Sequence, residues 1–411
     1  MDFFHLFSVI IVLAAAFAYI NFRILKLPDA IGLMMMSLIF SLVILVFGYF
    51  FPLLKETISV KLTGINFSEL LLEGLLSFML FAGAIHLKYD DLKSESLAIL
   101  LFSTVSVLIS TFLVGIATFY LLNIVGIKVQ LFHSLLFGAL ISPTDPIAIL
   151  SILKTAGISK SLETKIAGES LFNDGVAVVV FITLLQLAQP NASLELANGI
   201  LLFGQEAIGG ILLGLTIGWF GFRLIASIDN YRVEVLITLA VVMGGYSLAH
   251  FLHVSGPLAM VAAGIIIGNQ GKNFGMSSIT TEYIYKFWEL IDEILNAILF
   301  VLIGLELLLI SVDPPIIFAS LLIIISTICI RYFSLFIPSL AIHRKEKTNQ
   351  RTLLILTWGG LRGGISIALA LSIQPDMGKD AWVTITYIVV CFSILVQGLT
   401  IGKLAKKFKK L

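Results

Sequence analysis

An apolar stretch of the chain opens with four polar side chains, Glu169, Ser170, Asn173 and Asp174, and continues as the apolar run 176–185. On a helix, residues four apart lie on the same face, so these four side chains share one broad face. A carboxylate at mid-membrane costs at least about 2.5–3.5 kcal/mol on insertion scales, and its usual role there is in an ion pathway or a proton relay. Asp174 is therefore the first candidate for chemistry.

The composition places these residues in a membrane. The 411 residues are 59% hydrophobic and 12% charged, with a mean hydropathy of +1.06, which is typical of a polytopic membrane protein. The net charge of +1 gives no indication of nucleic-acid binding. Cys329 and Cys391 lie inside apolar runs and are interpreted as small core residues, so no cofactor is expected. No hydrophilic interval is long enough for a soluble domain, and we expect 1–411 to form a single membrane unit.

Apolar runs of spanning length predict an all-α protein with thirteen transmembrane segments. The predicted segments are 4–21, 29–52, 66–87, 96–122, 130–153, 165–188, 199–225, 233–253, 256–270, 285–311, 315–342, 352–373 and 381–401.

The basic residues predict the orientation of these segments. Of the 26 lysines and arginines, 20 fall in one set of alternate loops and 4 in the other, while Arg331 and Arg362 lie within segments. Because cytoplasmic loops carry the excess of positive charge, the N-terminus is expected outside and the C-terminus in the cytoplasm. The basic end of the chain, 403–411, is expected to be a cytoplasmic tail that contacts anionic lipids. Asp2 and the lack of a basic leader favour a retained first segment.

Two segments are interrupted at their centres. In the fifth, Pro143 and Pro146 flank Asp145, and in the twelfth, two glycine pairs flank Arg362. Proline removes a backbone donor, and each glycine costs a helix about 1 kcal/mol. Backbone left unpaired at that depth is tolerated only beside protein or a watery cavity. Both segments are therefore predicted to be broken helices.

The positions of the breaks predict a repeat. They are seven segments apart, an odd number, so the two broken helices should cross in opposite directions. Two inverted six-helix repeats, approximately 1–188 and 233–402 and joined by a linking helix within 189–232, would produce this arrangement, which is typical of a transporter. At such a crossing Asp145 can offset the positive helix N-termini and Arg362 the negative C-termini.

Three motifs together resemble the monovalent cation:proton antiporter-1 family, the NhaP/NHE-type sodium/proton exchangers. They are Thr144-Asp145-Pro146, the Gly-Glu-Ser-Leu-Phe-Asn-Asp run at 168–174, and the Gly-Gly-Leu-Arg-Gly run at 359–363. The likeness extends over nearly the whole chain. It implies a homodimer in which an ion-translocating core, the segments within 96–188 and 315–401, moves past a dimerisation domain in an elevator-like motion.

The resemblance also implies roles for the polar residues. Asp174 would be occupied alternately by a cation and a proton. Ser170 and the main chain of Thr144 would complete the oxygen shell around the cation, and Asn173 would brace the unwound crossing.

The sequence says less about the roles of three further charged residues, Glu169, Glu73 and Arg331. Glu169 is expected to pair with Arg362. Some relatives place an acidic ligand in the third segment, where this chain has only Glu73, and the sequence leaves open whether Glu73 reaches the ion. For Arg331, the sequence favours two roles over a role in transport. The side chain snorkels, with its charged end reaching the membrane surface, or it pairs at a domain boundary.

The predicted activity is secondary antiport of Na⁺ or Li⁺ against H⁺ by alternating access, in a bacterial-type inner or plasma membrane. Cation and proton compete for Asp174. Because Asn173 stands where a second titrating aspartate would allow charge movement, one-for-one electroneutral exchange is expected. A K⁺/H⁺ antiporter on the same scaffold stays open, since selectivity depends on oxygen placement. An intramembrane aspartyl protease with an Asp145–Asp174 dyad, or a channel, is the alternative of another class, but we expect a transporter and not an enzyme.

Overall fold

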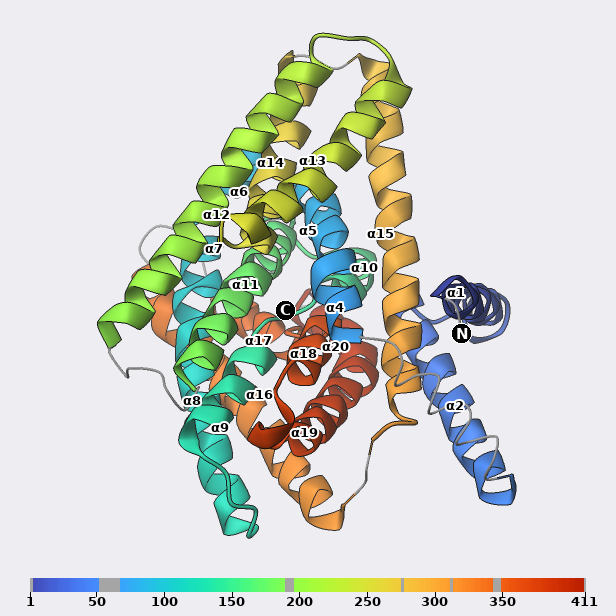
Figure 1. Cartoon of the computed structure of the whole chain (residues 1–411), viewed down its shortest axis with the longest axis vertical. Helices are drawn as coiled ribbons and strands as arrows, with labels where there is room; N and C mark the ends of the chain where they lie inside the picture. The colour runs from blue at the N-terminus through green and yellow to red at the C-terminus, as the bar shows by residue number, and fades with distance from the viewer. Residues whose placement is uncertain are drawn as a thin grey trace.

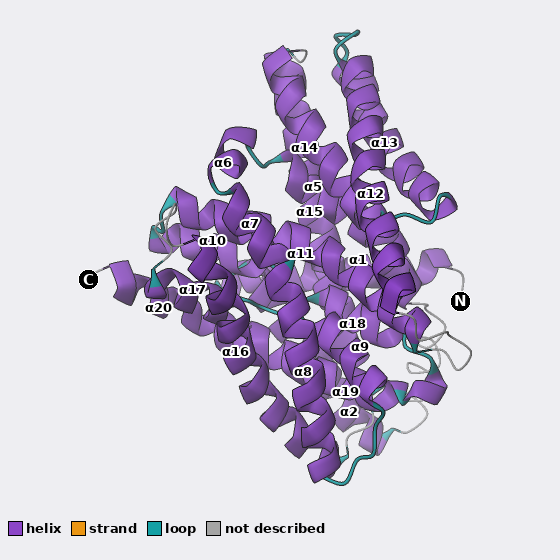
Figure 2. Ribbon diagram, turned by 90° about the vertical axis from the view of Figure 1, so that its left-hand side faces the viewer, coloured by secondary structure: helices purple, strands orange, loops and turns teal. Residues whose placement is uncertain are grey.

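The computed structural model describes residues 3–51, 67–188, 196–274, 277–310, 313–342 and 349–409. Within these ranges the protein is all-helical and contains no β-strand, as predicted (Figure 2). Each of the thirteen predicted segments corresponds to a helical segment in the described part of the chain.

Several spans in the first half of the chain consist of more than one helical piece. The bounds are α1 (Phe3–Ile20) with the π-helical turn η1 (Asn21–Leu25); α2 (Asp29–Phe50); α4 (Phe67–Glu69), η2 (Leu70–Leu75) and α5 (Leu76–Ile85); the short α6 (Tyr89–Ser94); α7 (Ser96–Ser103) and α8 (Val105–Ile124); α9 (Leu131–Ile141) and α10 (Ile147–Ala156); and α11 (Lys160–Leu187).

The second half is built from longer helices. The bounds are α12 (Leu196–Ile225), α13 (Tyr231–Phe251), α14 (Gly256–Phe274), α15 (Ser278–Glu306), α16 (Pro314–Ile342), α17 (Gln350–Trp358), α18 (Gly364–Leu371), the 3₁₀ turn η3 (Pro375–Met377), and α19 (Lys379–Phe392), which continues through η4 (Ser393–Gln397) into α20 (Gly398–Lys409).

Nine spans are long and apolar enough to cross a membrane, judged by length and composition over the described residues. The other four predicted segments are α14, α15 and the two broken helices, α9–α10 and α17–α18. The protein is thus a multi-pass membrane protein. Residues 403–409 of the expected tail continue α20 as helix beyond the predicted end of the last segment at 401, while 410 and 411 lie outside the described residues. The helix persists because it is amphipathic, with Ala405 buried and Lys403, Lys406 and Lys407 exposed.

Packing divides the helices into two groups. In one group α12, α13, α14 and α15 pack together with α1, α2 and α5, and in the other α7 to α11 pack with α16 to α20. In Figure 1, α12 to α14 form the upper part of the molecule and α16 and α19 the lower part. Contacts between the groups run through α11, which meets α12 and α14, and through α18, which meets α15.

The helix that carries Asp174 begins at a well-defined point. Gly157 adopts a left-handed conformation (φ +75°) and ends α10, so the chain turns within three residues. Ser159 then caps α11, its side chain accepting a hydrogen bond from the Leu162 amide at 3.3 Å. Such a cap contributes about 1 kcal/mol and fixes where the helix begins. The register of Asp174 is set from this end.

Candidate ion-binding site

The two helix breaks cross and are held together by their main chains. The amide of Asp145 donates a hydrogen bond to the carbonyl of Leu361 at 2.8 Å. The amide of Arg362 donates to Ser393 Oγ at 2.9 Å. The first bond joins the two breaks directly, and the second pairs a freed amide with a side chain of η4 in the last span, so backbone groups that lose helical pairing find partners within the protein. The predicted crossing of two broken helices is confirmed.

Arg362 lies at the C-terminal end of α9. Its Nη1 donates to the carbonyl oxygens of Ser142 and Pro143 at 2.5 and 2.9 Å, and the side chain is buried. These carbonyls follow the last turn of α9, where a helix has unpaired acceptors and a partial negative charge. The prediction that Arg362 offsets a negative helix end is confirmed.

Asp145 lies at the opposite kind of helix end. It precedes Pro146, the N-cap residue of α10, and its side chain also lies against Gly363, the residue that caps the N-terminus of α18. A carboxylate here offsets the partial positive charge of two helix N-termini, as predicted. The approach is close: a Cβ at Gly363 would lie 2.7 Å from Asp145 Oδ2. Gly363 of the second glycine pair is therefore explained by contact with Asp145, whereas a Cβ at Gly364 would meet Leu299 at 2.3 Å.

Three oxygen-bearing side chains from α11 and the first break form a buried cluster. Asn173 Nδ2 donates to Thr144 Oγ1 at 2.9 Å, and its Oδ1 accepts from the Thr144 amide at 3.4 Å. Ser170 Oγ lies 3.2 Å from Thr144 Oγ1. Asn173 thereby holds the unwound segment, the bracing that the family resemblance implied. Thr144 and Ser170, the two residues that the resemblance placed around the cation, lie side by side.

Asp174 is buried, with 7% of its surface exposed, and its side chain lines a cavity of about 80 Å³. Asp145, Pro143 and Gly363 from the two breaks line the same cavity. Among the described residues, the Asp174 carboxylate has no ion-pair partner. It is therefore a buried carboxylate beside a small space, free to take up a cation or a proton.

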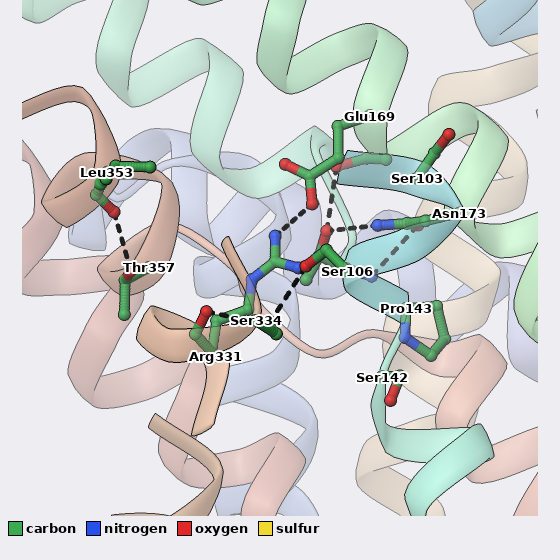
Figure 3. A network of polar contacts seen from close by, with 12 residues as sticks. Ser103, Ser106, Ser142, Pro143, Glu169, Asn173, Arg331, Ser334, Leu353 and Thr357 are labelled. Carbon is green, nitrogen blue, oxygen red and sulfur yellow. Dashed lines mark hydrogen bonds and ion pairs between the residues drawn. The ribbon is translucent and has the colours of Figure 1, made fainter. Parts of the chain in front are cut away.

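The prediction that Glu169 pairs with Arg362 is wrong. Glu169 forms an ion pair with Arg331 of α16, and both side chains are 2% exposed (Figure 3). Figure 3 shows the Arg331 guanidinium pointing at the Glu169 carboxylate, with the Asn173 side chain nearby. Arg362 is already engaged by the α9 carbonyls, so the carboxylate pairs with the other arginine that lies within a segment. Of the two roles expected for Arg331, snorkelling and pairing, the structure shows pairing, with Glu169.

The structure leaves Glu73 out of this arrangement, because its side chain is exposed in η2 and does not line the cavity. Sequence reasoning missed Asp292 of α15, which lines the same cavity as Asp174. Trp288 and Asn296 lie four residues to either side of Asp292 and so on the same helical face, and the structure shows both buried.

Comparison with known proteins assigns the family. The family model described as "Sodium/hydrogen exchanger, transmembrane" matches residues 11–407. The chain belongs to this sodium/hydrogen exchanger family. The intramembrane aspartyl protease considered from the sequence is thereby overturned, and a role as a transporter and not an enzyme is supported.

The sequences of two named relatives align with almost the whole of this chain. It is 46% identical to the Na⁺/H⁺ antiporter NhaP of Pseudomonas aeruginosa, over 98% of this chain and 96% of that one. It is 34% identical to the Na⁺/H⁺ antiporter NhaH of Halobacillus dabanensis, over 94% and 93%. The solved structure of the sodium proton antiporter MjNhaP1 from Methanocaldococcus jannaschii at pH 8 matches with a TM-score of 0.77 at 20% identity, covering 98% of this chain and 97% of that one. This match shows a common fold.

Proposed function

We propose that this exchanger carries Na⁺ or Li⁺ across the membrane in one direction and H⁺ in the other. Its family and the names of its relatives support Na⁺/H⁺ antiport. The cation and the proton occupy the same carboxylate, Asp174, at different times. No enzymatic step and no cofactor are involved, because the ions are substrates.

The proposal rests on the burial of Asp174 and on its lack of an ion-pair partner in the described part of the chain. It is a buried carboxylate that lines a cavity at the helix crossing and has no ion-pair partner among the described residues. A buried charge without a partner is unfavourable, whereas the same group bound to a cation or a proton is neutral. Asp174 therefore crosses loaded with one or the other, which couples the two flows.

The neighbouring oxygens suit a small cation. Thr144 and Ser170 present hydroxyl oxygens 3.2 Å apart in a cluster braced by Asn173. Together with Asp174 and the main chain of Thr144 they would supply the oxygen ligands that hard cations prefer. Since Asn173 does not titrate, one proton replaces one cation, and exchange is electroneutral.

The movement that carries the site across the membrane is assigned to the two helix groups. The site lies in the group formed by α7 to α11 and α16 to α20, which packs against the other group mainly through α11 and α18. We assign this site-bearing group as the moving core of an elevator and the other group as the dimerisation domain of a homodimer. We further propose that 1–188 and 233–402 form the two inverted repeats and that the N-terminus lies outside the cell.

The test uses purified protein in liposomes with a fluorescent indicator of internal pH. An outward Na⁺ gradient is expected to acidify the lumen through wild-type protein, whereas Asp174→Ala leaves internal pH unchanged. Asp313→Asn, at an exposed loop position, is the control and should behave as wild type.

Two outcomes would change the assignment. Exchange that persists in folded Asp174→Ala removes Asp174 from the central role. A pH change driven by K⁺ but not by Na⁺ or Li⁺ identifies the K⁺/H⁺ alternative instead.

A further inference from the structure

The cavity beside Asp174 has a second acidic wall. Asp292 of α15 lines it from the other helix group, facing the crossing formed by Asp145, Gly363 and the start of α18. Asp292 Oδ1 is buried and has no hydrogen-bond partner among the described residues. A carboxylate oxygen left unpaired at this depth is costly unless something else binds it.

A second unpaired group points to the same space. Ser366, on the first turn of α18, is 1% exposed and lines the cavity, and its Oγ has no partner in the described part of the chain. Most buried serines in helices bond to a carbonyl of the preceding turn, as Ser142 does with Gly138 at 2.6 Å. The Ser366 hydroxyl is thus available to a ligand in the cavity.

The charge of the cavity selects the class of ligand. Its described lining contains three carboxylates, those of Asp145, Asp174 and Asp292, and no lysine, arginine or histidine. A volume of about 80 Å³ exceeds the roughly 30 Å³ that one water occupies in the liquid, so a cation and an accompanying water both fit. Anions and large organic molecules are excluded by charge and by size.

Asp292 is not explained as a structural residue. Asn296, one turn later, bonds through Nδ2 to the main-chain oxygen of Asp292 at 2.7 Å, and Asp292 Oδ1 keeps no hydrogen-bond partner among the described residues. No basic side chain forms an ion pair with Asp292 among the described residues. The neighbouring Glu293, by contrast, is exposed.

We propose that Asp292 and Ser366 form a second subsite for the transported monovalent cation, across the cavity from Asp174. The inference rests on the proposed antiport and deepens it: the cation binds at Asp292 on α15 before it transfers to Asp174 on α11. Because the two carboxylates belong to different helix groups, Asp292 raises the local cation concentration at the mouth of the moving site and is not carried with it.

The test is the Na⁺ dependence of exchange in liposomes at fixed pH, measured as apparent KM and Vmax. Asp292→Asn keeps the size of the side chain and is expected to raise KM for Na⁺ about tenfold, since a close charge–charge contact at low effective dielectric is worth at least that factor. Vmax stays within about twofold, because Asp174 still carries the ion. Glu293→Gln removes the same charge one residue away and leaves both parameters unchanged.

Several results would overturn the subsite. For folded Asp292→Asn, these results are an unchanged KM or a loss confined to Vmax. For Glu293→Gln, the contradicting result is a rise of KM as large as that of Asp292→Asn, which would indicate a general effect of negative charge. If Asp292→Asn does not fold, Ser366→Ala decides: a rise of KM supports the subsite and an unchanged KM rejects it. These outcomes are distinct from failure of the proposed antiport, which would appear as absent exchange in wild type or as persistent exchange in Asp174→Ala.

Discussion

Glu169 and Asp174 lie five residues apart on α11, both buried, and of the two only Glu169 is ion-paired in the described part of the chain. One carboxylate is neutralised permanently by Arg331, so it can remain charged at this depth. The other has room beside it and no fixed counter-charge, so its occupant can change. The difference separates a residue that holds the helices from one that can carry ions.

The Glu169–Arg331 pair is expected to be a large contributor to stability. Replacing Arg331 with Met leaves the Glu169 carboxylate buried and unpaired, which costs about 3–5 kcal/mol. The melting temperature in detergent should fall clearly, and the double variant Glu169→Gln, Arg331→Met should recover part of the loss. Arg232→Met, at an exposed position of α13, is the control. A normal melting temperature for Arg331→Met would show that the pair contributes little.

Arg362 is expected to stabilise the protein through the carbonyls at the end of α9 and not through Glu169. Arg362→Ala leaves the carbonyls of Ser142 and Pro143 without their donor, at about 1–3 kcal/mol for each buried group. The variant should melt earlier and lose exchange, while Glu169 keeps its partner. Arg362→Lys, which retains a charge and a donor, should be less affected than Ala. Equal thermal stability of wild type and Arg362→Ala would contradict this role.

Gly363 is expected to tolerate no side chain. A Cβ there would lie 2.7 Å from Oδ2 and 2.8 Å from Cβ of Asp145, so Gly363→Ala must displace Asp145 or the crossing. Overpacking of this kind costs about 1–3 kcal/mol, and exchange should fall with it. Gly204→Ala, in α12 where a Cβ meets nothing within 4 Å, is the matched control and should be neutral or slightly stabilising. Wild-type exchange by Gly363→Ala would show that the contact with Asp145 is dispensable.

The fold was largely predictable from the sequence because few backbone conformations are stable inside a membrane. Backbone groups in hydrocarbon must be paired internally, so apolar runs of spanning length become helices. Proline and glycine pairs flanking single charges identified both breaks and the ends that Asp145 and Arg362 offset. The extension of α20 to 409 was missed because hydropathy falls there, although the helical spacing of Ile401 and Ala405 continues.

The partners within the site were less predictable. Two arginines and several carboxylates lie at similar depth, and the sequence carries no information on which pairs face each other. Arg362 was assigned to Glu169 because both residues lie in recognised motifs. The groups that Arg362 actually binds are main-chain carbonyls at the end of α9, and a sequence motif records side chains only. Asp292 was overlooked because a polar helical turn resembles an interfacial one until the helix is placed against the cavity.

Asn173 is expected to matter by holding Thr144. Asn173→Ala removes both hydrogen bonds to the unwound segment, at about 0.5–1.5 kcal/mol each, and loosens one wall of the oxygen cluster. Apparent KM for Na⁺ should rise about tenfold, with a smaller loss of stability. Asn123→Ala, at an exposed position of α8, is the control. An unchanged KM in Asn173→Ala would mean that Thr144 is positioned by the crossing alone.

The proposed competition for Asp174 predicts the direction in which pH acts. Under this proposal protons and Na⁺ exclude each other from one carboxylate, so lowering the pH should raise the apparent KM for Na⁺, up to a limit of about tenfold per pH unit. Saturating Na⁺ should restore the rate, because the cation then displaces the proton. With one charge exchanged for one, a K⁺ diffusion potential set by valinomycin should leave the rate unchanged. A wild-type current that follows the membrane potential, or a Vmax that falls with pH at constant KM, would show that a further titrating group takes part, and Asp292 is the group to replace next.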